Sequence, residues 1–368
     1  MTGELLRATP FYARTAEANR LNKWENRGGY TLSVSYADPL AEAVAARFGA
    51  VLADISWRRR AAITGARVNE FVSFFFARDV SRLAPGAALE ALWLNDAGGV
   101  RGLGSVVRTG RESFRLVSDA DDTDWLMQAA ALYGAGVRDV TAEEGVLALI
   151  GPYAGQVLEV AGLDANLEPL ALRKYFWKGL DITLSRLGVG YELWCAADDA
   201  LIVWDRLVAA GRPFALRPAG QAAMDILELE SGIVRPGRDF TPARDGFSPA
   251  SSPQSLGLDG LVGREHDFNG RAGFLAAGAA QTLAGLLLDR ETPAPHAALT
   301  RNGKPAGLTL GSLTSPSMGR AIALAVLDPA HAAPGTELQL PGAACRTVAL
   351  PFLPIPGPMP SGDGKSAS

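Results

Sequence analysis

The sequence predicts an α+β protein that ends in a small β-barrel. Strand-like and helix-like runs occur in blocks rather than in strict alternation, which favours α+β over a doubly wound parallel sheet. From residue 303 to residue 353, short apolar runs are broken by glycine and proline, a pattern that is typical of a small barrel. The chain has 368 residues, of which 48% are hydrophobic, and this is enough for two or three packed domains.

Glycine and proline mark the ends of the elements expected in the first part of the chain. Residues 39–50 have helical periodicity that stops at Gly49. Residues 61–80 predict a strand, a turn at Gly65 and a helix. Residues 81–120 predict three or four strands, with a tight turn at Ala97-Gly98-Gly99.

The second part of the chain continues with mixed elements. We expect a helix over 123–135, a strand, turn and helix over 146–163, and two strands and a helix over 181–211. A further helix over 218–233 ends near Gly232. Residues 235–256 are rich in Pro, Ser, Arg and Asp, and the apolar residues among them predict an ordered loop.

Composition narrows the class of protein. A net charge of −4, from 35 basic and 39 acidic residues, gives no reason to expect nucleic acid or an anionic membrane as a partner. Two distant cysteines form no disulfide framework, and the three histidines lack a second ligand at helical spacing. Since no signal peptide or membrane span is evident, we expect a cytoplasmic protein without a metal, and we leave its oligomeric state open.

Several stretches, taken in order, resemble one family. They are residues 15–30, 49–65, 77–100, 190–233, 252–262, 267–275 and 307–327. In these stretches the chain resembles the aminomethyltransferase fold of the glycine-cleavage T protein, which is shared by dimethylsulfoniopropionate and aryl methyl ether demethylases. Each motif alone is weak, but their order and spacing cover nearly the whole chain.

The resemblance implies a folate-binding-type domain with a central hole and a barrel packed against it. We assign residues 1–285 to the aminomethyltransferase-like domain, with two α/β subdomains around the hole. Residues 300–355 form the barrel in this assignment, and residues 356–368 form a disordered tail. The implied activity is one-carbon transfer from a small molecule to tetrahydrofolate.

Three departures from the family pattern argue against folate chemistry. The family hairpin carries an aspartate pair, where this chain has Gly102 and Leu103. The stretch "SRLGVGYE" at 185–192 is shorter than the family loop that lines the folate hole. Ser255 replaces a family glutamate. The hairpin therefore lacks a carboxylate that could deprotonate or polarise an amine.

One feature of the folate site is kept. Glu192 matches the family glutamate that pairs with the pterin ring. A carboxylate suits adjacent N–H donors because it accepts both at once. The alternative is that Glu192 holds a neighbouring arginine.

Other candidates lie in the N-terminal part of the chain. Trp57 precedes three arginines, and strand geometry would place Arg58 and Arg60 on one face, where they could bind a carboxylate or phenolate. A solvated edge strand is the alternative.

Tyr30 and Tyr36 lie where the resemblance places the substrate side of the hole, so either could bind a substrate oxygen or act as a general acid. Ordinary half-buried tyrosines are the alternative.

Three further residues are candidates with a simple packing alternative. Trp93 and Arg101 lie on the two arms of the hairpin and could stack on a flat substrate or pair with an anion. Tyr191 is next to Glu192 but points to the opposite face of the strand. We take Tyr36, Trp57, Trp93 and Tyr191 as candidate substrate-binding residues.

These observations leave three hypotheses of function. The first is a folate-independent lyase that needs no cofactor and releases formaldehyde from a hydroxymethyl group of a small aromatic substrate, using Tyr30, Arg58, Arg101 and Glu192. The second is a tetrahydrofolate-dependent demethylase or aminomethyltransferase, in which Glu192 binds the cofactor. The third is a non-enzymatic protein that binds an anionic ligand.

Overall fold

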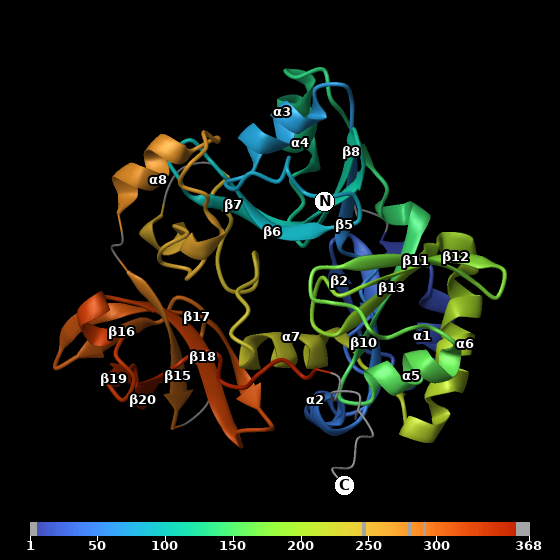
Figure 1. The fold of residues 1–368 in the computed structure, drawn as a ribbon. Coiled ribbons are helices and arrows are strands. Elements are labelled where there is room, and N and C mark those ends of the chain that lie inside the picture. Colours follow the sequence, from blue (N-terminus) through green and yellow to red (C-terminus); the bar gives the residue numbers. More distant parts are fainter. Residues whose placement is uncertain (1–5, 245–247, 279–280, 290–291, 358–368) are drawn as a thin grey trace, which may run out of the picture.

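The computed structural model of the chain describes residues 6–244, 248–278, 281–289 and 292–357. Figure 1 shows two α/β lobes and a barrel, with helix α7 (Gln221–Glu230) lying between the first lobe and the barrel. The predicted α+β class with a C-terminal barrel is confirmed. Most of the tail that we expect to be disordered, from residue 358 on, lies outside the described residues.

The first lobe contains two sheets. A sheet of six strands has the order β11-β12-β13-β10-β4-β14, and a sheet of three strands has the order β1-β3-β2. The strands are β1 (Arg7–Ala8), β2 (Trp24–Arg27), β3 (Tyr30–Ser33), β4 (Val51–Asp54), β10 (Glu144–Ile150), β11 (Leu172–Trp177), β12 (Leu180–Ser185), β13 (Tyr191–Ala196) and β14 (Arg217–Pro218). The helices of this lobe are α1 (Tyr12–Ala18), α2 (Pro39–Phe48), α5 (Ala154–Ala161) and α6 (Ala200–Gly211).

The second lobe is a sheet of five strands in the order β6-β7-β8-β5-β9. Its elements are β5 (Arg59–Thr64), α3 (Val68–Phe75), β6 (Ala88–Leu94), β7 (Val100–Gly110), β8 (Ser113–Ser118), α4 (Thr123–Ala131) and β9 (Gly136–Asp139). An aromatic cluster that includes Phe71, Phe75 and Trp93 fills the space between the sheet and its two helices. Phe75 and Phe76 therefore pack the core of this lobe, whereas Phe74 is 39% exposed.

The C-terminal barrel is closed by six strands in the order β15-β18-β17-β16-β19-β20. They are β15 (Thr282–Leu288), β16 (Ala298–Arg301), β17 (Lys304–Ser315), β18 (Arg320–Leu327), β19 (Glu337–Leu340) and β20 (Ala343–Val348). The barrel begins at Thr282, whereas the sequence-based boundaries end the first domain at residue 285 and start the barrel at residue 300. The first barrel strand thus lies largely in the segment assigned to the preceding domain.

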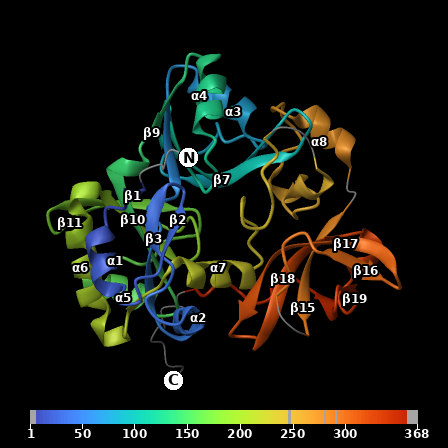
Figure 2. The same cartoon turned by 180° about the vertical axis from the view of Figure 1, so that it is seen from behind.

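Helix α7 joins the first lobe to the barrel, as the reverse view in Figure 2 also shows. It packs against α2 on one side and against β17 and β18 on the other. At its end, the fully buried Glu230 forms an ion pair with Arg47 of α2 and accepts a hydrogen bond from Ser315 of β17. This carboxylate therefore links three parts of the fold.

Local signals in the sequence agree with several observed elements. Helix α2 starts after Asp38, whose side chain accepts a hydrogen bond from Leu40 N, and it ends at Gly49 as predicted. The turn predicted between β6 and β7 is present, with Gly98 at φ +83°. A Cβ on Gly98 would lie 2.3 Å from the backbone nitrogen of Phe274 in α8 (Arg271–Ala277), so this turn requires glycine for close approach as well as for its conformation.

Two more features of the described chain are the state of its cysteines and the length of its helices. Cys195 and Cys345 are free and buried. Within the described ranges, no helix is long and apolar enough to cross a membrane.

Candidate active site

A cavity of about 430 Å³ lies where the first lobe, the end of β8 and helix α7 meet. One part of its wall is apolar and consists of Ile55, Ala148, Val189 and Met224. The rest of the wall is dominated by charged side chains, which alternate in sign. They are Arg27, Arg58, Asp119, Glu192, Asp225, Glu228, Arg235 and Arg238.

Arg58 lies between two carboxylates at one end of the cavity. Its Nε donates to Asp119 Oδ1 at 2.7 Å, and its Nη1 donates to Glu192 Oε1 at 3.2 Å. Its Nη2 makes no hydrogen bond to any residue that the structure describes. Because Arg58 lines the cavity, this remaining donor is available to a bound molecule.

The alternation of charge continues from Asp119 toward α7. Arg235 contacts Asp119 Oδ2 at 3.2 Å through Nη1 and Glu228 Oε1 at 2.8 Å through Nη2. Arg238 Nη1 lies 3.1 Å from Glu228 Oε2. Glu228 is therefore shared by two arginines.

The far end of the series reaches the N-terminal sheet. Arg238 Nη1 lies 3.5 Å from Asp225 Oδ1, and Arg27 Nη2 lies 2.6 Å from Asp225 Oδ2. Arg27 Nε also contacts Glu25 at 2.9 Å. We call the series from Glu25 to Glu192 the ion-pair chain. It connects β2, α7, the loop after α7, the end of β8, the β4–β5 connection and β13.

Asp119 is ionised within this chain. Burial opposes its ionisation, but the charges of Arg235 and Arg58 outweigh burial and lower the pKa of Asp119 to about 2. In the same way, Asp119 and Glu228 overcome the effect of burial on Arg235 and raise its pKa. These partners therefore remain charged across the physiological pH range.

Glu192 has donors on both of its oxygens. Oε2 accepts from Ser185 Oγ at 3.3 Å and from Trp194 Nε1 at 3.2 Å, while Oε1 accepts from Arg58. A carboxylate has about four lone-pair sites, so these donors leave about one site free, on Oε1. Glu192 can therefore accept one further proton donor from the cavity.

Trp57 forms another fixed part of the wall. Its Nε1 donates to Gln221 Oε1 at 3.1 Å, and Gln221 Nε2 donates to the carbonyl oxygen of Asp54 at 2.8 Å. The guanidinium of Arg27 lies 5.4 Å from the centre of the indole ring. Both contacts hold the indole in one orientation.

Two protein-family models together match most of the chain. The family model of the GCVT N-terminal domain matches residues 12–262, and that of the glycine cleavage T-protein C-terminal barrel domain matches residues 281–353.

The chain belongs to the glycine-cleavage T-protein family.

Individual relatives are consistent with this membership. The aminomethyltransferase of Frankia alni is 33% identical over 337 residues, which cover 88% of this chain and 90% of that protein. The trimethylamine-oxide aldolase of Ruegeria pomeroyi is 28% identical over 329 residues, which cover 83% of this chain and 41% of that protein. The crystal structure of the glycine cleavage system aminomethyltransferase T from Bartonella henselae superposes with a TM-score of 0.83 at 25% identity, covering 95% of this chain and 99% of that one. The resemblance stated from sequence is confirmed, and the named relatives are enzymes.

The structure brings three of the candidate residues together. Arg58, Trp57 and Glu192 all line the central cavity of this T-protein-family chain. Tyr30 and Tyr36 are not among the residues that line it. Tyr30 is 2% exposed, and its hydroxyl has no hydrogen-bond partner in the part of the chain that the structure describes. Burial raises the pKa of Tyr36, whose phenol lies beside Ser33 and Thr15.

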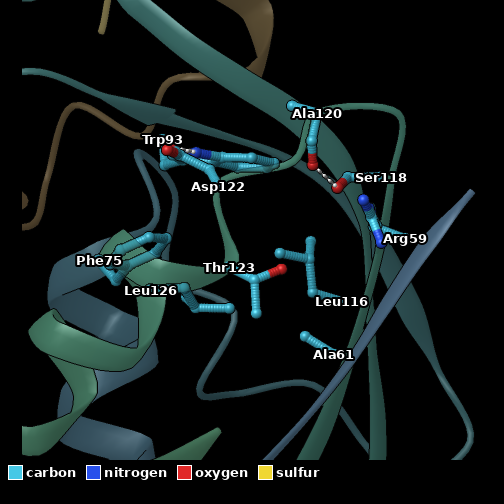
Figure 3. Close-up of a pocket in the computed structure, with 10 residues that line it drawn as sticks. All are labelled: Arg59, Ala61, Phe75, Trp93, Leu116, Ser118, Ala120, Asp122, Thr123 and Leu126. Atoms are coloured by element: carbon cyan, nitrogen blue, oxygen red, sulfur yellow. Dashed lines mark hydrogen bonds between the residues drawn. The ribbon is translucent and has the colours of Figure 1, made fainter. Parts of the chain in front are cut away.

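The structure places the hairpin candidates elsewhere. Trp93 lines a crevice of about 10 Å³ in the second lobe, where Figure 3 shows its indole beside Asp122. Trp93 Nε1 donates to Asp122 Oδ2 at 2.9 Å, and Arg101 binds the same carboxylate at 2.6 Å. The guanidinium of Arg101 also lies 4.2 Å from the ring centre of Trp125. This crevice has no room for a substrate.

Tyr191, Arg59 and Arg60 contact other parts of the fold and do not line the central cavity. Tyr191 packs in the core of the first lobe, and its hydroxyl donates to Ala165 O at 2.8 Å. Arg60 is 1% exposed and donates to several main-chain carbonyls, including Thr141 O. Arg59 pairs with Asp121 near the surface. Of the three successive arginines, only Arg58 lines the central cavity.

Gly102, which stands at the hairpin position of the family acids, has no space for a side chain. It pairs across the hairpin with Trp93, and a Cβ on Gly102 would lie 2.2 Å from Trp93 Cζ2. Trp93 is 1% exposed and its indole is hydrogen-bonded to Asp122, so displacing it would disrupt packing and a hydrogen bond. A carboxylate at this position is therefore incompatible with the indole.

A substitution tests this packing. We expect Gly102→Ala to lower the free energy of unfolding by about 1–3 kcal/mol, because the added methyl group overpacks the hairpin. Urea denaturation monitored by circular dichroism measures the change. Gly260→Ala is the matched control, since nothing lies within 4 Å of the position of its Cβ. An unchanged midpoint for Gly102→Ala would show that Trp93 has room to move.

Six charged residues that line the cavity were not identified as site residues from the sequence. They are Arg27, Asp119, Asp225, Glu228, Arg235 and Arg238. The available signal was the arginine-rich start of the loop at 235–238, which was expected to be ordered but was not connected with the cavity.

Proposed function

We propose that this chain is a folate-independent carbon–carbon lyase that releases formaldehyde from a hydroxymethyl group of a small aromatic substrate. The observation that carries the proposal is the state of Glu192. This residue is paired with Arg58 and keeps about one free acceptor site at the cavity. That arrangement suits one hydroxyl group.

The residues present do not fit tetrahydrofolate in the way that the resemblance implies. A pterin edge presents two parallel N–H donors, which need a free site on each carboxylate oxygen. Oε2 of Glu192 already accepts from Ser185 and Trp194. The hairpin position of the family acid is Gly102, which is backed by Trp93. Both observations support a reaction that does not use the cofactor.

The site residues suit a retro-aldol type of cleavage. Glu192 takes the proton of the substrate hydroxyl, the bond between the hydroxymethyl carbon and its neighbour breaks, and formaldehyde leaves. The electron pair of the broken bond stays on the neighbouring carbon, which is attached to the aromatic ring and is not a ring atom, so that the ring spreads the charge, and Glu192 returns the proton to that carbon. The hydroxymethyl compound thus becomes formaldehyde and a shortened aromatic product, with no oxidant or reductant.

Arg58 has the complementary role. Its Nη2 can donate to the substrate oxygen and fix the hydroxyl beside Glu192. The apolar wall formed by Ile55, Ala148, Val189 and Met224 can hold the aromatic body. A relative named as a trimethylamine-oxide aldolase supports the proposal, because 41% of that protein matches this chain and its name describes a lyase.

A second candidate function is favoured by a separate observation. The relatives named as aminomethyltransferases cover most of this chain, and Glu192 is kept at the family position. A tetrahydrofolate-dependent demethylase or aminomethyltransferase acting on a small substrate therefore remains the alternative. It requires Glu192 to exchange its present donors for the cofactor.

One experiment separates the two functions. We expect the purified chain to release formaldehyde from a hydroxymethyl aromatic compound without added cofactor, as measured by a colorimetric formaldehyde assay. We expect calorimetric titration with tetrahydrofolate to show no binding in the micromolar range. Glu192→Gln should abolish formaldehyde release, since an amide cannot accept the hydroxyl proton. Micromolar binding of tetrahydrofolate that Glu192→Gln removes would favour the alternative.

A further inference from the structure

The charges of the cavity wall are balanced. Four arginines and four carboxylates line the cavity. Each of these arginines lies within 3.5 Å of at least one of these carboxylates. Glu25 and Asp239 add further negative charge behind Arg27 and Arg238. The described lining thus offers no cation without a counter-charge to an anionic ligand, and no carboxylate without a counter-charge to a cationic one.

Because the charged side chains of the wall are largely buried, their pairing affects which ligands can bind. The side chains of Arg58 and Asp119 are both 9% exposed, and that of Glu192 is 2% exposed. A charge that enters such a site must either break an existing pair or remain without a partner, and both are costly away from water. The wall therefore disfavours ligands that carry a permanent charge of either sign.

The same wall places donors directly beside acceptors. A hydroxyl group both accepts and donates a hydrogen bond, so it can contact a guanidinium and a carboxylate at once. Arg58 Nη2 and Glu192 Oε1 provide such a pair of sites. A hydroxyl bound there leaves the ion pairs intact, while the apolar residues around Ile55 cover a hydrocarbon body.

We infer that the cavity selects an uncharged aromatic alcohol, and that it rejects analogues of the same size that carry a carboxylate or an ammonium group. The identity of the alcohol as a hydroxymethyl compound rests on the proposed function. The charge selectivity comes from the cavity wall itself. It also argues against the third hypothesis, an anion-binding protein, because each arginine of the wall is already paired.

Three probes of similar size test the inference. They are 4-(hydroxymethyl)phenol, which is uncharged at pH 7, 4-(hydroxymethyl)benzoate and 4-(aminomethyl)benzyl alcohol. Calorimetric titration of the full chain at pH 7 is expected to show the uncharged probe binding at least about tenfold more tightly than either charged probe. A charged probe that binds as tightly as the uncharged one, or an uncharged probe that does not bind, would overturn the inference.

Two substitutions change the balance in opposite directions. Asp119→Asn leaves four arginines and three carboxylates lining the cavity, so the benzoate should gain about tenfold in affinity relative to the uncharged probe. Arg58→Met leaves an excess negative charge, so the aminomethyl probe should gain instead. Asp121→Asn is the matched control, because Asp121 pairs with Arg59 near the surface, and it should change neither ratio. Since the two variants are independent, either one tests the charge argument if the other fails to fold, and unchanged ratios in a folded variant would contradict it.

The outcomes for charge selectivity and for catalysis are separate. If the uncharged probe binds most tightly but a 2-arylethanol releases no formaldehyde, the proposed function is wrong and the charge selectivity stands. If formaldehyde is released but a charged probe binds better, the reverse holds.

Discussion

Replacing Arg58 by lysine is expected to lower kcat/KM for formaldehyde release by about 100-fold, the effect of losing one well-placed donor at a reacting oxygen. In the structure, a single guanidinium contacts Asp119 through Nε, contacts Glu192 through Nη1 and keeps Nη2 for the cavity. A lysine ammonium is a point charge at the end of a flexible stem, so it cannot hold all three positions together. Steady-state formaldehyde assays measure the loss.

Arg59→Lys is the control for this substitution. Arg59 is next in sequence and pairs with Asp121 and Asp139 outside the central cavity. Its replacement should leave kcat/KM within about twofold of the original value. If Arg58→Lys keeps full activity while Glu192→Gln loses it, then Arg58 supports the fold of the wall and does not contact the substrate.

Glu230→Ala is expected to lower the free energy of unfolding by about 3–5 kcal/mol, because it leaves a buried arginine without its partner. Glu230 is fully buried, whereas Arg47 has 11% of its side chain exposed. The substitution also removes the acceptor for Ser315 of the barrel. Thermal and urea denaturation measure the change, and we expect the barrel to lose its attachment to α7.

The surface pair between Arg67 and Glu70 offers the control. Both residues are more than half exposed, and Glu70→Ala should leave the denaturation midpoint unchanged. A midpoint for Glu230→Ala that equals that of the control would show that α7 is held to α2 and the barrel by apolar packing alone.

The sequence predicts those parts of the fold that have local signals. Gly49, Gly65 and the turn around Gly98 mark element ends because these positions need a break in the helix or an unusual backbone conformation. β11 was not predicted, since this edge strand carries charged residues and the exposed Phe176, and so lacks the alternation of a half-buried strand. The sequence-based start of the barrel, at residue 300, lies after β15. The strand is a short apolar run, and no proline separates it from the preceding helix, so the sequence does not mark its start.

The candidate site also contains residues that the sequence identifies and residues that it does not identify. Arg58 and Glu192 were found because both lie in stretches that resemble the family. The sequence offered an arginine as the alternative partner of Glu192, but it did not identify Arg58, which is 134 residues away. Asp119, Arg235 and Arg238 lie at the end of a strand and in a loop, where no periodicity or motif singles them out. Their role depends on which distant segments meet, and this is decided by the packing of whole lobes.

The ion-pair chain also limits how this protein can diverge. Each inner member touches at least two partners of opposite sign, so a single substitution changes the net charge of a series in which most members are buried or half-buried. New substrate preferences are therefore reached most easily when two neighbours change together, such as an arginine and the carboxylate beside it. In evolutionary terms the charged residues of the wall are inherited together, and a lineage that loses Arg58 has reason to lose one of its two carboxylate partners, Asp119 or Glu192, as well.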